Sequence, residues 1–329
     1  MEKKVAGVAR FLVIQPAFLG DAVLTLPLLG QLRISFPSAE IHWVLRKGVE
    51  ELFQDHPWAI QLWTWDKSWR EWLQLTRKLS KQKWDAVFVV QRHFRMGLLG
   101  LLVPAKTRIT YDKNPLSFFY THRVQHEFRA GIHEAARVVS LGVPVGLTAE
   151  LPPLPWLFPK ERVSSPTPYI ILSPTSRWPT KEAPFSYWAD FLRKLPSSLR
   201  IYLTGTASDR ERIGSLCRYH PNAENLAGQL SLKELAALVA GAQRVYTVDS
   251  ALTHIASALG VPTTTVFCST VPAFGFGPLA PRSTIVETPE PLPCRPCGLH
   301  GKKKCPLGTF SCGKFLPPIE VETELGEIV

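Results

Sequence analysis

Three parts of the sequence carry side chains that could do acid–base or phosphate-binding chemistry, and each follows an expected strand. They contain Asp21, Lys181 and the pair Asp249-Ser250. A positioned carboxylate can accept a proton from a hydroxyl, an ammonium can neutralise a phosphate, and the N–H groups at a helix start can bind an anion. The structural alternatives are a carboxylate that complements a helix dipole, a solvated lysine and a simple N-cap. Taken singly, these residues do not decide between the two interpretations.

Several common catalytic motifs are absent from the sequence. It contains no G-x-G-x-x-G after a strand, no G-x-x-x-x-G-K-[ST], no G-x-S-x-G and no H-E-x-x-H. Dinucleotide dehydrogenases, P-loop NTPases, serine hydrolases and zincins are therefore disfavoured. There is also no Asp-x-Asp, a spacing that could chelate a divalent metal bound to a nucleotide diphosphate. Protein groups would have to neutralise any diphosphate bound here.

The elements that must position these residues are predicted to alternate between strands and helices along the chain. Short apolar runs predict strands at 10–15, 40–45, 85–90, 169–173, 200–204, 244–248 and 263–267, with room for helices between them. Apolar residues at helical spacing from Leu24 to Phe36, with Gly20 and Asp21 at the start, predict one helix over 20–36 that is kinked by Pro27. Pro317 and Pro318 could open a final helix through Val329. Residues 151–168 are Pro-rich and are interpreted as a linker. We expect two Rossmann-like α/β domains with a cleft between them, spanning residues 1–155 and 156–329.

The charge and composition indicate a globular protein with an anionic partner. The 329 residues include 38 Lys and Arg against 27 Asp and Glu, a net charge of +11, while 45% of residues are hydrophobic. Nucleic acid, a phosphorylated small molecule or an anionic membrane would fit, although no groove-reading motif supports nucleic acid. We find no apolar stretch for a transmembrane helix and no secretory signal peptide, so we expect a cytoplasmic protein.

The segment Trp63–Trp84 could form an amphipathic helix that rests on a membrane. Trp69, Trp72 and Leu73 lie near helical spacing, and Arg and Lys residues surround them. Aromatic and basic side chains together suit an anionic membrane surface. The alternative is an ordinary helix that packs its apolar face on a sheet.

Four cysteines crowd the end of the chain in the pattern C-x2-C-x7-C-x6-C. They are Cys294, Cys297, Cys305 and Cys312. The pair Cys294 and Cys297 has the spacing of a zinc-binding pair. Cys305 and Cys312 are farther apart than the second ligand pair of a standard zinc knuckle, and His300 is an alternate ligand. A structural zinc ion, reduced thiols packed in a loop and a local disulfide all remain open.

Five ordered segments resemble the ADP-heptose:lipopolysaccharide heptosyltransferases, glycosyltransferase family 9. They are residues 18–41, 178–181, 225–232, 248–260, with its resemblance to D-[ST]-G-x-x-H-x-A-x-x-L-G, and the cysteine-containing tail 294–312. The chain departs from the family pattern in two places. Ala251 replaces a glycine, and Cys268-Ser269 replace a Gly-Pro pair.

The resemblance implies a GT-B fold and an inverting, metal-independent enzyme. It would transfer a heptose from ADP-heptose to the anionic inner core of lipopolysaccharide, with transient contact to the cytoplasmic face of the inner membrane. Asp21 matches the proposed base, Lys181 a lysine on the donor phosphates, and Ser250, Ala251 and Leu252 the helix start that cradles them. Further candidates are Thr204, Gly205, Asp209, Asp249 and His254 on the donor side, and Gly20 and His133 on the acceptor side. No cofactor is expected in catalysis. A transferase using another nucleotide sugar and a nucleotide-sugar-binding protein without turnover remain alternatives.

Overall fold

The computed structural model describes residues 8–128, 131–163, 165 and 167–320. The chain forms two compact units, one of Met1–Phe128 with Ile132–Phe158 and one of Arg129–Gly131 with Pro159–Val329. The Pro-rich segment interpreted as a linker begins inside the first unit, where Trp156 is buried. Among the described residues, we find no helix with the length and apolar character that a membrane crossing requires.

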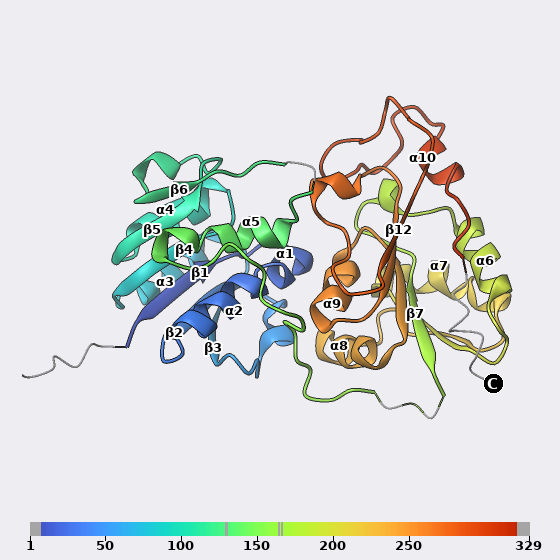
Figure 1. The fold of residues 1–329 in the computed structure, drawn as a ribbon, viewed down its shortest axis with the longest axis horizontal. Helices are drawn as coiled ribbons and strands as arrows, with labels where there is room; N and C mark the ends of the chain where they lie inside the picture. The colour runs from blue at the N-terminus through green and yellow to red at the C-terminus, as the bar shows by residue number, and fades with distance from the viewer. Residues whose placement is uncertain (1–7, 129–130, 164, 166, 321–329) are drawn as a thin grey trace, which may run out of the picture. The chain divides into compact units, whose positions relative to one another are not determined.

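The first unit is built on a parallel sheet of six strands in the order β3-β2-β1-β4-β5-β6 (Figure 1). The strands are β1 (Arg10–Ile14), β2 (Glu40–Arg46), β3 (Ile60–Trp65), β4 (Trp84–Val89), β5 (Ala105–Tyr111) and β6 (His122–Val124). The central strands β1 and β4 are almost entirely buried, because helices cover both faces of a parallel sheet. This strand order is that of a Rossmann fold, as predicted.

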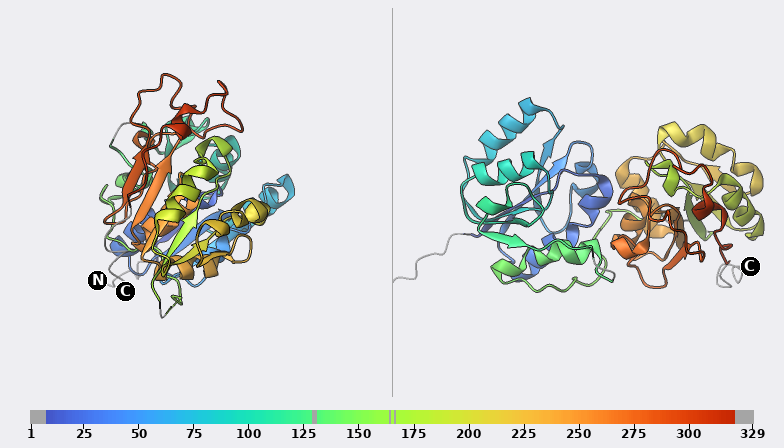
Figure 2. Two further views of the ribbon diagram at one scale, coloured as in Figure 1. Left: turned by 90° about the vertical axis from the view of Figure 1, so that its right-hand side faces the viewer. Right: turned by 90° about the horizontal axis from the view of Figure 1, so that it is seen from above.

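Helices cover both faces of this sheet. They are α1 (Leu19–Val23), α2 (Leu26–Ser35), α3 (Trp69–Leu79), α4 (Phe94–Leu102) and α5 (Glu134–Ser140), with 3-10 turns η1 (Glu50–Phe53), η2 (Ser117–Phe119) and η3 (Val143–Val145). Helices α3 and α4 share one hydrophobic core with the sheet, whereas α5 packs with α2 on the other side (Figure 2, right). The prediction of a single kinked helix over 20–36 is wrong. The chain forms α1 and then α2, and Pro27 lies in the first turn of α2, where its missing N–H costs no hydrogen bond.

The second unit repeats the same topology. Its strands are β7 (Tyr169–Ser173), β8 (Arg200–Leu203), β9 (Ala223–Asn225), β10 (Arg244–Val248), β11 (Thr263–Phe267) and β12 (Thr284–Glu287). All neighbours pair in parallel, in the order β12-β11-β10-β7-β8-β9. Because ligands of open parallel sheets bind beyond the carboxyl ends of the strands, those ends are where a site is expected.

Helices and a long tail complete the second unit. The helices are α6 (Phe185–Lys194), α7 (Arg210–Gly214), α8 (Leu232–Gly241), α9 (Ala251–Leu259) and α10 (Ser311–Lys314), and the 3-10 turns are η4 (Pro179–Lys181), η5 (Ala207–Asp209), η6 (Cys217–Tyr219) and η7 (Pro272–Phe274). The tail packs into the core of this unit through Cys312 and Ile319. Residues 317–320 are not helical, and the rest of the predicted final helix lies outside the described residues.

Candidate functional site

Lys181 and Asp249 form a largely buried ion pair beyond the carboxyl ends of the central strands of the second sheet. Lys181 closes η4 after β7, and Asp249 directly follows β10. The Lys181 Nζ lies 2.6 Å from Oδ2 of Asp249, with side chains only 13% and 8% exposed. Thr270, which follows β11, donates its hydroxyl to the same Oδ2 at 2.6 Å. The structure thus brings together two predicted residues and one that the sequence reasoning missed.

The start of α9 lies beside this ion pair. Ser250 is the N-cap by position, with extended backbone angles of φ −148° and ψ 175°. Within the described part of the chain its side chain accepts no capping hydrogen bond, and its Oγ lies 3.1 Å from Oγ1 of Thr247. The N–H groups of the first turn, at Ala251 and Leu252, are therefore not capped by Ser250 and can serve an anion.

His254 is the fourth residue of α9, one turn beyond the helix start. It is buried, and its ring packs 6.1 Å from the ring of Phe276. Thr204 is also buried, directly after β8, and a Cβ on Gly205 would come within 2.4 Å of Cδ1 of Ile213. A side chain at position 205 would therefore require the buried Ile213 of α7 to shift.

Asp209 is engaged by its own turn. Its Oδ2 accepts hydrogen bonds from the backbone N–H and the hydroxyl of Thr206, and Arg212 donates to its Oδ1 at 3.1 Å. Burial opposes ionisation of Asp209, but the bonds from Thr206 and Arg212 outweigh it and hold the pKa of the carboxyl below its usual value. Arg212 also donates to both oxygens of the buried Glu182, at 2.7 and 3.1 Å. The sequence reasoning missed Glu182, although it directly follows Lys181.

Asp21 is the third residue of α1 in the first unit, directly beyond β1. Its carboxylate is half-buried, and Oδ2 accepts a hydrogen bond from the Phe18 N–H at 3.2 Å. The helix start therefore fixes the orientation of the side chain. Gly20 is the preceding helical residue. His133 is the N-cap of α5, and its Nδ1 accepts a hydrogen bond from the Ala135 N–H at 3.1 Å.

A buried cluster of charged side chains, missed from the sequence, lies at the same edge of the first sheet as Asp21. Nε of the buried Arg137 lies 2.6 Å from Oε2 of Glu134, and Nε2 of His126 lies 3.5 Å from the other oxygen. Nη1 of Arg92, after β4, lies 3.3 Å from Nδ1 of His126. Burial opposes ionisation of Glu134, but His126 and Arg137 together hold its carboxyl pKa below the usual value. Two features of the sequence could have indicated this cluster. They are a basic residue after a strand and the i, i+3 spacing of Glu134 and Arg137.

The predicted zinc site is not formed by the four tail cysteines. No group of three or more His, Cys, Asp or Glu side chains is arranged to hold a metal ion in the parts of the chain that the structure describes. Cys312 is packed in the core, where burial and then the neighbouring thiols raise its pKa to about 11. Cys305 is held in its own turn, where the Phe310 N–H above all lowers the pKa of the thiol. Cys297 points its thiol to the Cys294 carbonyl at 3.3 Å. The thiols of Cys294, Cys297 and Cys305 thus lie near enough to Cys312 to raise its pKa, but among the described residues they are not arranged to hold a metal ion.

Comparisons of the sequence and of the structure with known proteins agree on one family. The sequence model described as "Glycosyltransferase family 9 (heptosyltransferase)" matches residues 72–305. The chain is 28% identical to lipopolysaccharide heptosyltransferase 1 of Pseudomonas aeruginosa, over 88% of this chain and 86% of that protein. Among solved structures, it resembles ADP-heptose lps heptosyltransferase II of E. coli with a TM-score of 0.72 at 22% identity, over 84% of this chain and 90% of that one. The structure of E. coli heptosyltransferase WaaC with ADP also gives a TM-score of 0.72 at 22% identity. This match covers 84% of this chain and 92% of that one. These structures confirm the predicted fold class of two Rossmann-like α/β units.

Proposed function

The chain belongs to glycosyltransferase family 9, and we propose that it transfers a heptose from ADP-heptose to the inner core of lipopolysaccharide. The observation that supports this proposal best is the ion pair of Lys181 and Asp249 beside the start of α9. An ammonium and a helix N-terminus at one sheet edge suit a diphosphate. The similarity to an E. coli heptosyltransferase solved with ADP supports adenosine as the nucleoside.

The donor side of the reaction belongs to the second unit. As the bond to the anomeric carbon breaks, the departing ADP gains negative charge, which Lys181 and the N–H groups of Ala251 and Leu252 would stabilise. Because these groups already supply positive charge and the sequence has no Asp-x-Asp, we propose that the transfer needs no divalent metal. In this proposal Asp249 and Thr270 orient the lysine.

The acceptor side belongs to the first unit. A sugar hydroxyl ionises far above neutral pH and needs a positioned base, which we assign to Asp21. A single displacement from the face opposite the leaving group inverts the anomeric centre. The arginines and histidine of the buried cluster, Arg92, Arg137 and His126, lie at the same sheet edge and would favour an anionic acceptor.

The test is a transfer assay with purified protein, ADP-heptose and a panel of inner-core acceptors. We expect transfer with inversion, and we expect the rate to stay within about twofold in excess EDTA, because no catalytic step uses a metal. Parallel reactions with UDP-sugars and GDP-sugars serve as controls. Transfer from one of these in place of ADP-heptose would establish the alternative donor. ADP-heptose binding without turnover would establish a binding protein, and a rate abolished by EDTA and restored by Mg²⁺ would contradict the metal-independent mechanism.

We also propose that one face of the first unit contacts the inner membrane at its cytoplasmic side. Large apolar side chains on this face are half or more exposed: Trp69 (55%) and Leu73 (50%) of α3, Phe94 (53%) and Leu102 (51%) of α4, and Phe118 (79%) and Phe119 (68%) of η2. The elements adjoin, since Trp72 Nε1 donates to the Arg95 carbonyl at 3.1 Å and the Tyr120 hydroxyl to the Gly97 carbonyl at 2.6 Å. Exposed cations on α3 are Arg70, Arg77 and Lys78, and the exposed Lys81 follows this helix. Aromatic groups among cations match an anionic bilayer.

Vesicle binding tests this surface. Each lysine near an anionic bilayer contributes about 1 kcal/mol, so Lys78→Gln with Lys81→Gln is expected to weaken binding to phosphatidylglycerol vesicles by about thirtyfold. Phe118→Ser with Phe119→Ser should also weaken binding, and salt should weaken that of the wild type. The matched control is Ile34→Ser, which changes a 62% exposed residue of α2 on the opposite face of the sheet. Equal loss in the control, or binding that ignores salt and all substitutions, would contradict the proposal.

A further inference from the structure

The cysteine-containing tail is hydrogen-bonded directly to the turn that carries Lys181. Thr180 is buried, and its hydroxyl donates to the Lys302 carbonyl at 2.9 Å while accepting from the Lys302 N–H at 2.7 Å. The Thr180 N–H also donates to the Lys302 carbonyl at 3.2 Å. A side chain that bonds in both directions with one distant residue fixes η4 against the tail.

The loop after β11 also contacts Thr180, through Ser269. The Ser269 hydroxyl donates to Oγ1 of Thr180 at 3.0 Å, and the Ser269 N–H donates to the Thr180 carbonyl at 3.2 Å. Ser269 stands where the family pattern has proline, which has neither an N–H nor a hydroxyl. The serine that replaces this proline therefore donates two of the hydrogen bonds that hold Thr180.

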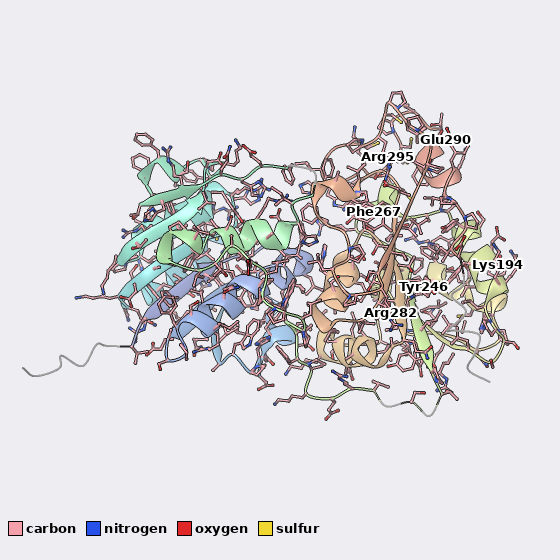
Figure 3. All side chains as sticks on the ribbon, viewed as in Figure 1. Lys194, Tyr246, Phe267, Arg282, Glu290 and Arg295 are labelled. Carbon is pink, nitrogen blue, oxygen red and sulfur yellow. The ribbon has the colours of Figure 1, made fainter. Side chains whose placement is uncertain are left out.

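Arg295 anchors the tail to the same loop, beside Phe267 at the end of β11 (Figure 3). Its guanidinium donates to the carbonyls of Cys268 at 2.7 Å and Thr270 at 2.8 Å, and pairs with Glu287 at 2.6 Å. Thr270 in turn donates to Asp249, the partner of Lys181. The tail thus reaches the lysine by two routes, through Thr180 and through Thr270.

We infer that the tail is a positioning clasp for the donor site, in which Thr180 and Arg295 hold Lys181 where it meets the donor diphosphate. This inference rests on the proposed function. Gly301 gives the closest approach, because a Cβ there would lie 3.2 Å from Cγ of Lys181 and 3.0 Å from Oγ1 of Thr180. A lysine has a long flexible stem, so fixing its base and its ion-pair partner lowers the entropy lost when it binds a phosphate.

Two substitutions test the clasp by calorimetric titration with ADP and by steady-state kinetics. Thr180→Val keeps the shape but removes the hydroxyl, and we expect ADP affinity to fall about tenfold. The donor KM should rise while the acceptor KM stays unchanged, a split that general destabilisation would not produce. Thr180→Ser keeps the hydroxyl and should restore ADP affinity to nearly the wild-type value.

Gly301→Ala provides an independent test with a matched control. Gly301 has φ +74° and Gly308 has φ +69°, so alanine strains both backbones similarly, but of the described atoms none lies within 4 Å of a Cβ at Gly308. We expect Gly301→Ala to weaken ADP binding about tenfold and Gly308→Ala to leave it unchanged. Equal weakening in both variants would overturn the inference, because backbone strain alone would then explain it.

Lys181→Met separates failure of the clasp from failure of the proposed function. If Lys181→Met binds ADP as the wild type does, the proposed donor site is wrong. If Lys181→Met loses ADP while folded Thr180→Val and Gly301→Ala bind it normally, the clasp is wrong and the donor site stands. Should Thr180→Val fail to fold, the glycine pair decides.

Discussion

Asp21→Asn is expected to lower kcat by about 100-fold to 10,000-fold while ADP affinity stays unchanged. A general base contributes on this scale, and an amide cannot accept the proton of the attacking hydroxyl. Asparagine keeps an oxygen that can accept the Phe18 N–H, so the start of α1 should remain intact. The measurement is the initial rate of transfer at saturating donor and acceptor.

A second acid in the same unit controls for the change of charge. Asp66 also accepts a hydrogen bond from a nearby backbone N–H, that of Ser68 at 2.7 Å, and lies before α3. Asp66→Asn should keep kcat within about twofold, because a surface substitution of this kind touches no reacting group. Near-normal turnover of a folded Asp21→Asn protein would show that Asp21 serves only as a helix-start residue.

The double-wound fold could be predicted from the sequence because its central strands are buried on both faces. β1, β4, β7, β10 and β11 consist mostly of apolar, aromatic or β-branched residues, which is a direct consequence of burial in a parallel sheet. The edge strands β3, β6, β9 and β12 and the internal strand β5 were not predicted. The edge strands are less buried than the central ones, and the first half of β5 carries Lys106 and Arg108 and is only partly buried. A sequence pattern indicates a strand mainly where the residues of the strand are buried, and the residues of edge strands are less buried.

The candidate site could be predicted in part, for a related reason. Lys181 and Asp249 each follow a predicted strand, and parallel strands place such residues at one sheet edge. Their pairing depends on side-chain directions that spacing does not encode. Thr180 and Thr270 were missed because a threonine near a strand end has no distinguishing pattern, and its role comes from partners far along the chain. The cysteine spacing left a zinc site, packed reduced thiols and a local disulfide open, and the described residues form no metal-holding group, with Cys312 packed in the core.

Lys181→Met should lose ADP affinity by about 100-fold, because a buried charge-assisted contact to the diphosphate disappears. The same substitution leaves the Asp249 carboxylate buried with Thr270 as its hydrogen-bond donor but without its cation. Breaking a buried pair in this way costs about 3 kcal/mol of unfolding free energy. Loss of ADP binding by this variant alone would therefore mix a lost contact with a weakened fold.

The double variant Lys181→Met with Asp249→Asn separates these two effects. It removes both charges of the ion pair, and an asparagine oxygen can still accept the Thr270 hydroxyl, so we expect most of the unfolding free energy to return in urea denaturation. ADP affinity should stay low, since the phosphates still meet no ammonium. Recovery of ADP binding together with stability would mean that Lys181 only neutralises Asp249, and the diphosphate would then have to be held by the start of α9 alone.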